Sequence, residues 1–277
     1  MSDRKVVSKV QRIDRNKKPV QKEPVVKPEV KDFKNYLNVF NFITRLPGSG
    51  KAVKFKPMSI GTLKSFLTVS EDEYDPITMT EMLDQIFENC VINEDFDPNE
   101  MYVNDRYALL LEIRKKTKGE TNQITITCPE CKGQSVQTID FEKIEVKEMP
   151  KNVNHIVKIT DELSIEMDYE TRQDELIAFD FFNELKKDLK KEQWDTELNL
   201  CVLAQTIKEI ITPDGPQEDI TINDKKYLIE NIPQPLYQKI TKWHEENAFG
   251  PDLTVEIKCP HCNFTKKEDI TDLNFFS

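Results

Sequence analysis

The chain has 277 residues, of which 38% are hydrophobic and 9% aromatic, so it can build a core in one large domain or two smaller ones. Its net charge of −11 divides unevenly: residues 1–34 carry +6, with eleven basic and five acidic side chains, and the remainder carries −17. An acidic body argues against nucleic acid as a partner. No apolar run approaches the roughly 18–20 residues of a membrane span, which excludes stable membrane insertion.

Residues 1–34 are rich in Lys, Val and Pro and poor in aromatic side chains. This composition predicts a disordered basic arm, which serves either as a solvated spacer or as a partner-binding segment. After the arm we expect an N-terminal half at 35–150 and a C-terminal half at 151–277.

The first ordered segment contains a Gly-Ser-Gly-Lys run at 48–51 that resembles a phosphate-binding loop. That loop requires G-x-x-x-x-G-K-[ST], whereas Arg45 replaces the first glycine and Ala52 replaces the hydroxyl residue. An ordinary glycine turn is therefore favoured over nucleotide binding. A strand at 53–55 and a helix at 60–67 are expected to follow.

Two helices are predicted before the middle of the chain. Apolar residues recur at i, i+3, i+4 and i+7 between Thr78 and Cys90, which indicates an amphipathic helix. Asp97 then has the character of an N-cap, with Pro98 at the first helical position. We expect the helix that begins there to continue through Lys118.

Two matching motifs, Cys128-Pro-Glu-Cys131 and Cys259-Pro-His-Cys262, begin 131 residues apart. Each motif ends an alternating apolar run that predicts a strand. Gly119 and Gly250 each stand nine residues before the first cysteine, where a glycine would end a preceding helix. The repetition predicts two pseudo-repeated halves, each containing a helix, a glycine, a strand and a cysteine knuckle.

Four thiolates in two C-x-x-C pairs suit one tetrahedral zinc ion. We therefore predict that Cys128, Cys131, Cys259 and Cys262 hold one structural Zn²⁺ per chain. Because four thiolates leave no position for a water molecule, the ion would staple the two halves together rather than catalyse hydrolysis. Unfilled thiols, and a redox or catalytic use of them, are the alternatives.

The remaining candidates for chemistry are few. His261 lies inside the second knuckle, where it is expected to be exposed rather than a ligand, and Cys90 and Cys201 fall in apolar helical patterns that predict inert core residues. Only three histidines are present, and no G-x-S-x-G or H-E-x-x-H motif occurs. The sequence therefore predicts no catalytic residue and no small-molecule substrate.

Further elements are expected after the first knuckle. They are strands at 135–141 and within 153–169, helices at 174–189 and 196–211, a turn at 213–216, and a helix at 236–247. Together the elements predict an α+β protein whose two pseudo-repeated halves are joined by a zinc-ribbon-like site of four cysteines.

Several segments resemble those of a known family. They are the Leu-Pro-Gly element at 46–50, the Phe-Lys-Pro-x-x-Ile-Gly element at 55–61, the helix at 83–90 and the Ile-Thr-Cys-Pro segment at 126–129. In combination they resemble the baseplate proteins of T4-type contractile-tail phages. The resemblance is best between residues 40 and 141, and the second knuckle extends it toward the C-terminus.

The resemblance implies a non-enzymatic tail protein that acts in assembly of the baseplate hub, as a hub subunit or as an assembly chaperone. Its partners would be other baseplate and hub proteins, in the host cytoplasm during assembly or in the tail baseplate of the virion. The alternative is a zinc-ribbon regulator that binds the transcription machinery or nucleic acid. Acidic residues beside the knuckles, such as Glu130 and Glu268, argue against that alternative.

Overall fold

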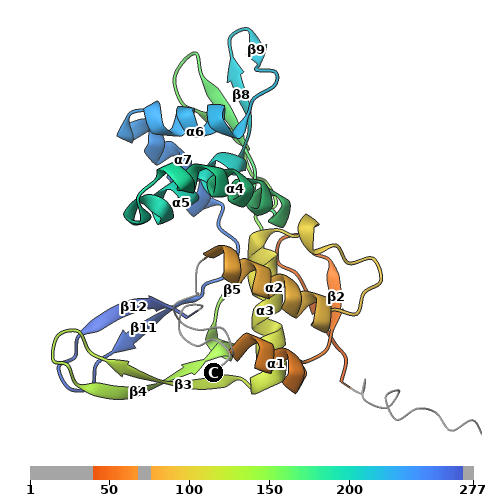
Figure 1. The fold of residues 1–277 in the computed structure, drawn as a ribbon, viewed down its shortest axis with the longest axis vertical. Coiled ribbons are helices and arrows are strands. Elements are labelled where there is room, and N and C mark those ends of the chain that lie inside the picture. The colour runs from red at the N-terminus through yellow and green to blue at the C-terminus, as the bar shows by residue number, and fades with distance from the viewer. Residues whose placement is uncertain (1–39, 68–75, 271–277) are drawn as a thin grey trace, which may run out of the picture. The chain divides into compact units, whose positions relative to one another are not determined.

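The computed structural model describes residues 40–67 and 76–270, so the predicted arm at 1–34 lies outside the described residues. Within these ranges the chain forms seven α-helices and five antiparallel sheets, four of which have only two strands (Figure 1). The fold is therefore mixed α+β, as predicted. None of the described helices combines the length and the apolar character that crossing a bilayer requires.

The elements have the following bounds. The helices are α1 (Ile60–Leu67), α2 (Pro76–Cys90), α3 (Val103–Lys118), α4 (Arg172–Leu185), α5 (Trp194–Thr206), α6 (Ile222–Asn231) and α7 (Gln234–Glu246). The two-stranded sheets are β1 (Phe42–Arg45) with β2 (Ala52–Phe55), β3 (Thr121–Thr127) with β4 (Gln134–Asp140), β5 (Val146–Lys147) with β10 (Gly250–Pro251), and β11 (Thr254–Lys258) with β12 (Thr265–Asp269). The four-stranded sheet has the order β6 (Ile156–Lys158), β7 (Ser164–Met167), β8 (Ile207–Thr212), β9 (Gly215–Pro216).

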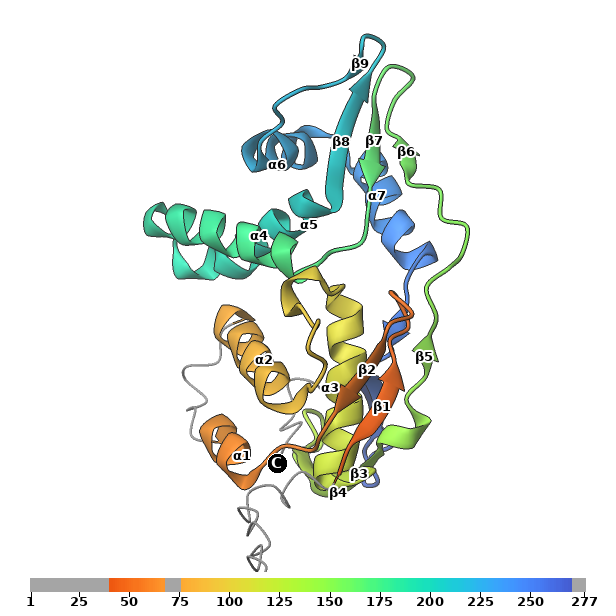
Figure 2. The same cartoon turned by 90° about the vertical axis from the view of Figure 1, so that its right-hand side faces the viewer.

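Helix α3 contributes much of the first hydrophobic core, in which Leu109 and Ile113 are completely buried. Strand β2 runs beside this helix (Figure 2) and adds Phe55 to the same core. Ile257 and Ile270, from the far end of the sequence, belong to it as well. Segments more than 100 residues apart therefore share one core.

The predicted helix at 97–118 is interrupted. Asp97 does act as a cap, but it caps a single 3₁₀ turn at Pro98–Glu100, and α3 begins only after two extended residues. The break arises because the Met101 carbonyl accepts a hydrogen bond from the Arg172 N–H at 2.9 Å. Pairing with the start of α4 thus replaces the hydrogen bonds that would have continued the helix.

The predicted helix at 196–211 is wrong at its C-terminal end. Helix α5 stops at Thr206, and the following residues form strand β8. This strand pairs with β7 on one side and β9 on the other, and its three isoleucines favour an extended backbone. The predicted turn at 213–216 is observed at 213–214, where it connects β8 to β9.

Helix α6 and strand β1 were not predicted, although the sequence carried a signal for α6. Thr221 accepts a hydrogen bond from the Asp224 N–H, and the Asp224 carboxylate accepts one from the Thr221 N–H. This reciprocal capping box satisfies two amides that the first turn of a helix leaves unpaired. A Thr-x-x-Asp sequence before an apolar run is therefore a usable start signal.

A buried group of charges connects α2, α3 and α4. Asp84 lies at its centre, with one carboxylate oxygen 2.7 Å from Arg106 Nη1 and the other 2.7 Å from Arg172 Nη2. Glu175 lies 3.3 Å from Arg172 Nη1. Both arginine side chains are only 1% exposed, so their charges depend on these carboxylates rather than on water.

Candidate metal centre

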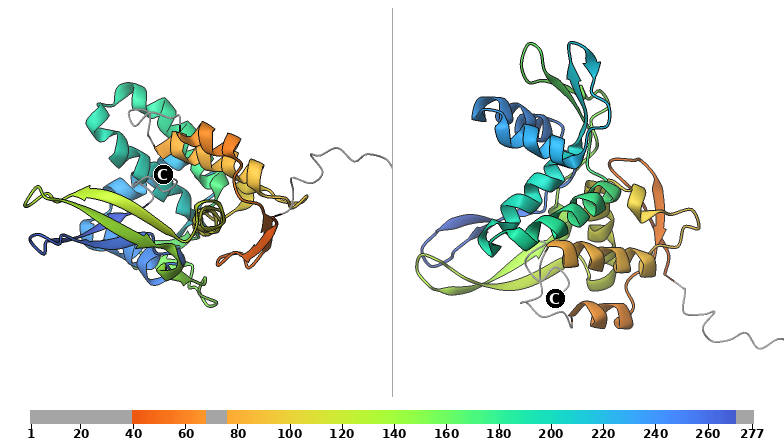
Figure 3. Two further views of the ribbon diagram at one scale, coloured as in Figure 1. Left: turned by 90° about the horizontal axis from the view of Figure 1, so that it is seen from below. Right: turned by 45° about the horizontal axis from the view of Figure 1, so that its top comes forward.

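The four motif cysteines lie in the loops of two β-hairpins, β3–β4 and β11–β12. These hairpins lie side by side, as Figures 1 and 3 show, although Cys128 and Cys259 are 131 positions apart. In each hairpin the first strand stops just before the first cysteine, so the strand ends at the cysteine motif. The loops, 128–133 and 259–264, have the same length.

The two loops have the same backbone hydrogen bonds. The Cys128 N–H donates to the Gly133 carbonyl at 2.9 Å, and the Cys259 N–H donates to the Phe264 carbonyl at 2.8 Å. These bonds close each loop around its pair of cysteines. The equivalence of the knuckles thus extends from sequence spacing to backbone geometry.

Each loop also contains one residue with a left-handed backbone. Lys132 has φ of 58° and Asn263 has φ of 61°, and each stands four residues after the first cysteine of its loop. Their N–H groups donate back to the carbonyls of Cys128 and Cys259 at 3.0 and 2.9 Å. Asparagine adopts this conformation readily, whereas lysine does so less often. The shared left-handed residue therefore reflects the demands of the loop rather than a local preference.

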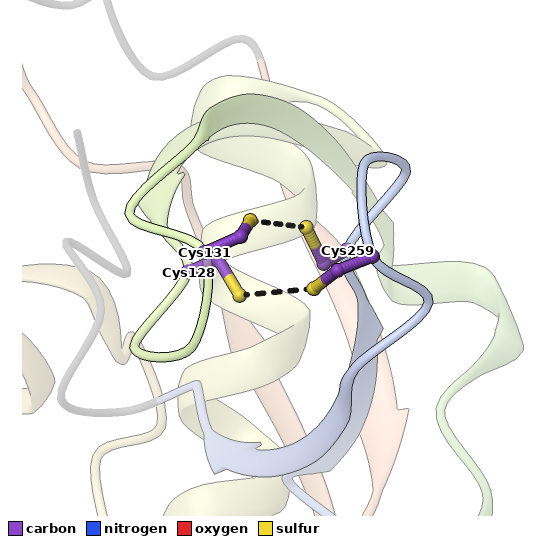
Figure 4. Close-up of side chains that lie close together, drawn as sticks. Cys128, Cys131 and Cys259 are labelled. Carbon is purple, nitrogen blue, oxygen red and sulfur yellow. Dashed lines mark hydrogen bonds between the residues drawn. The ribbon is translucent and has the colours of Figure 1, made fainter.

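The sulfur atoms of the four cysteines meet between the two loops (Figure 4), with every pair within 4.8 Å. Two contacts across the loops, Cys128 Sγ to Cys262 Sγ and Cys131 Sγ to Cys259 Sγ, are 3.6 Å long. None of the four forms a disulfide bond. Sulfurs at about 2.3 Å from a tetrahedral zinc ion would be about 3.8 Å apart. The donor set and its spacing therefore fit such an ion.

The loop backbone also favours the ionised form of one thiol. Burial raises the pKa of Cys259, but hydrogen bonds from the N–H groups of Cys262 and His261, together with neighbouring sulfurs, lower it to about 6. The thiolate is the form of cysteine that binds metal. Cys128 and Cys259 are buried, at 5% exposure each, while Cys131 and Cys262 face solvent.

His261 is exposed, as predicted, and its Nε2 lies 3.1 Å from the Gln134 carbonyl oxygen. Because a carbonyl only accepts hydrogen bonds, this nitrogen carries the proton and offers no lone pair to a metal. A Cβ at Gly133 would lie 2.7 Å from the His261 ring. A glycine at that position therefore allows the two loops to approach each other.

The other two cysteines belong to the hydrophobic cores. Cys90 and Cys201 are 1% and 0% exposed. Burial is the largest influence on both thiols and raises each pKa to about 11. A thiol that stays protonated near neutral pH is a poor nucleophile. In the described part of the chain, the four motif cysteines form the one group of three or more His, Cys, Asp or Glu side chains that could hold a metal.

The Gly-Ser-Gly-Lys run forms a turn whose amides are already used. The N–H groups of Gly48 and Ser49 donate to the two carboxylate oxygens of Asp105 at 2.6 and 2.8 Å, and Asp105 is completely buried. A phosphate would need these same amides. The geometry supports a glycine turn rather than a nucleotide site. Sequence reasoning missed Asp105 because it lies more than 50 residues from the turn.

Comparison with known protein families identifies a match to T4 bacteriophage base plate protein over residues 39–276. Comparisons with curated proteins and with solved structures found no match. The matched range contains both hairpins and all the segments in which the resemblance was found, so the predicted resemblance is confirmed. The chain therefore belongs to the T4 bacteriophage base plate protein family and is a baseplate-associated structural protein.

Proposed function

We propose that this protein acts in assembly of the baseplate hub by binding other tail proteins, as a hub subunit or as an assembly chaperone. The observation that carries the proposal is the family match over residues 39–276, which extends through the three hydrophobic cores of the described residues and through both cysteine loops. The charge of −17 outside residues 1–34 suggests partners with basic surfaces. The protein would act in the host cytoplasm during assembly, and as a subunit it would remain in the virion baseplate. It would have no catalytic role and no small-molecule substrate.

The proposal includes one structural zinc ion per chain, held by Cys128, Cys131, Cys259 and Cys262. Sulfur spacing and the hydrogen bonds to the Cys259 sulfur support this assignment. Four sulfurs complete a tetrahedral coordination shell, so the ion would supply a cross-link and leave no open position for chemistry. It would staple the β3–β4 hairpin to the β11–β12 hairpin.

We further propose that the zinc joins two pseudo-repeated halves, 35–150 and 151–277. The matching loops support this, as do the left-handed glycines that precede them: Gly119 with φ of 94° and Gly250 with φ of 90°. Their surroundings differ, because Gly119 directly follows α3, as predicted, whereas Gly250 lies in β10, beyond the end of α7. The prediction that Gly250 ends a helix is therefore wrong, since Asn247 already caps α7. The resemblance between the halves is therefore strongest in the hairpins.

The decisive test is capture of an affinity-tagged chain from infected bacteria, with mass spectrometry of the bound proteins and a parallel search for the chain in purified virions. An infection with the untagged chain is the control. Hub proteins in the capture with none of the chain in virions would identify an assembly chaperone, and presence in both would identify a subunit. Capture of RNA polymerase or nucleic acid without tail proteins would overturn the proposal in favour of a zinc-ribbon regulator.

A further inference from the structure

We propose that a groove beside α6 is the docking surface for a lysine- or arginine-bearing segment of another tail protein. This rests on the proposed function, because it assumes that the chain binds tail proteins. The groove has a volume of about 520 Å³ and lies between α6 and the β8–β9 hairpin. We call it the α6 groove and define it by its apolar floor and its acidic rim.

The floor of the α6 groove is apolar and partly exposed. Ile210 of β8, Leu228 of α6 and Ile232 at its end line the groove. They also pack against a second hydrophobic core, in which Ile165 and Ile207 are completely buried. Tyr227 stands beside them with 68% of its surface exposed. An exposed aromatic next to half-buried aliphatic side chains is typical of a protein contact surface.

The rim of the α6 groove is acidic. It contains Glu218, Asp219 and Asp224, and no lysine or arginine lines the groove. Asp224 already caps α6, whereas Glu218 and Asp219 make no ion pair within the described part of the chain. Lys226 of α6 is paired with Glu197 and Glu230 and does not line the groove. The groove therefore presents negative charge without a compensating cation of its own.

A basic peptide segment fits this surface better than a metal ion or the acidic body of a second copy of the chain. The rim carboxylates do not form a metal-ligand cluster, since the described residues hold only the cysteine group. A second acidic body would be repelled by the rim. Aliphatic side chains could cover the floor while one or two cations reach the rim, which joins apolar burial to charge complementarity.

The test uses fluorescence anisotropy with the full-length protein at about 150 mM salt, which weakens long-range attraction to the acidic body. The probe is a labelled hexapeptide of alternating lysine and valine. Two control peptides replace valine by glycine or lysine by glutamate. We expect both controls to bind at least fivefold more weakly than the probe, because each removes one of the two groups that the groove recognises.

Two groove variants and one control locate the binding. Tyr227→Ala removes the exposed aromatic side chain. Glu218→Gln with Asp219→Asn removes two rim charges while keeping side-chain size, and asparagine tolerates the φ of 57° at position 219. Each is expected to weaken binding at least fivefold. Glu94→Gln with Asp95→Asn is the control, because it removes the same charge from exposed residues outside the groove. Equal weakening by the control, or wild-type affinity in both groove variants, would overturn the proposal.

Capture from infected bacteria separates this inference from the function on which it rests. If the wild-type chain captures tail proteins and the groove variants capture at least one of them much less, the docking surface is supported. If groove variants capture the same proteins in the same amounts, the groove is refuted while the proposed function stands. If the wild-type chain captures no tail protein, the proposed function fails and this inference fails with it.

Discussion

Loss of the four-sulfur site should loosen the whole protein. The perturbation is Cys128→Ser combined with Cys259→Ser, which removes one ligand from each hairpin and leaves two thiols that cannot fill a zinc coordination shell. The metal would close a chain loop of about 130 residues, and the chain-entropy relation for such a cross-link gives about 5 kcal/mol. At roughly 2–4 °C per kcal/mol, the midpoint of thermal unfolding should fall by about 10–20 °C.

The assay combines calorimetry with colorimetric measurement of zinc released by denaturation. The wild-type chain should release one zinc per chain and the double variant close to none. His261→Ala is the matched control: it lies in the same loop and should keep the metal, while loss of its hydrogen bond to Gln134 should lower the unfolding temperature much less, by about 1–6 °C. A wild-type chain that releases no zinc, or a double variant that unfolds at the wild-type temperature, would refute the reasoning.

Three further outcomes are expected. Asp84→Ala leaves the buried Arg106 without its ion-pair partner and Arg172 with Glu175 alone, so it should lower the free energy of unfolding in urea by about 3–5 kcal/mol. Asp161→Ala, whose side chain is 98% exposed, should change it by less than about 0.5 kcal/mol, and equal effects would contradict this account. Gly48→Ala would put a Cβ 2.5 Å from an aromatic carbon and should destabilise by about 1–3 kcal/mol in thermal unfolding, whereas Gly61→Ala should be neutral or stabilising by up to about 1 kcal/mol. Burial, with nearby carboxylates, raises the pKa of Glu170 well above its ordinary value of 4.5, so the folded state retains a proton that the unfolded chain releases, and stability is lost as pH rises above 4.5. Glu170→Gln should remove that loss. The free energies of unfolding of variant and wild type, measured in urea, should therefore agree at acid pH and differ increasingly toward neutral pH. A difference that does not change with pH would contradict the assignment.

Local signals in the sequence were sufficient for much of the fold. The apolar spacing between Thr78 and Cys90 predicted α2 to within two residues of its observed start, because an amphipathic helix is defined by neighbours three and four positions apart. The paired knuckles predicted two equivalent loops, because their hydrogen bonds lie within six residues. Where a structure is determined by near neighbours, the sequence is informative about it.

Long-range contacts account for the rest. The isoleucines after Thr206 fit a helix as well as a strand, and pairing with β7 decides between them. Met101 leaves the helical path because its carbonyl bonds to Arg172, far along the chain. The buried pairing of Asp84 with arginines of two other helices has no local signal at all. The repeated C-x-x-C motifs predicted that the four sulfur atoms lie together, whereas zinc binding stays a prediction.

The shared first core has a consequence for synthesis of the protein. Ile257 and Ile270 complete a core whose other members lie between residues 46 and 141. At about 5–20 residues per second, a ribosome needs on the order of 10 s to make the intervening chain. During that interval part of the apolar surface around α3 is exposed to solvent, because Ile257 and Ile270 have not yet been made. A message truncated before the second hairpin should therefore yield an aggregating fragment rather than a smaller working protein.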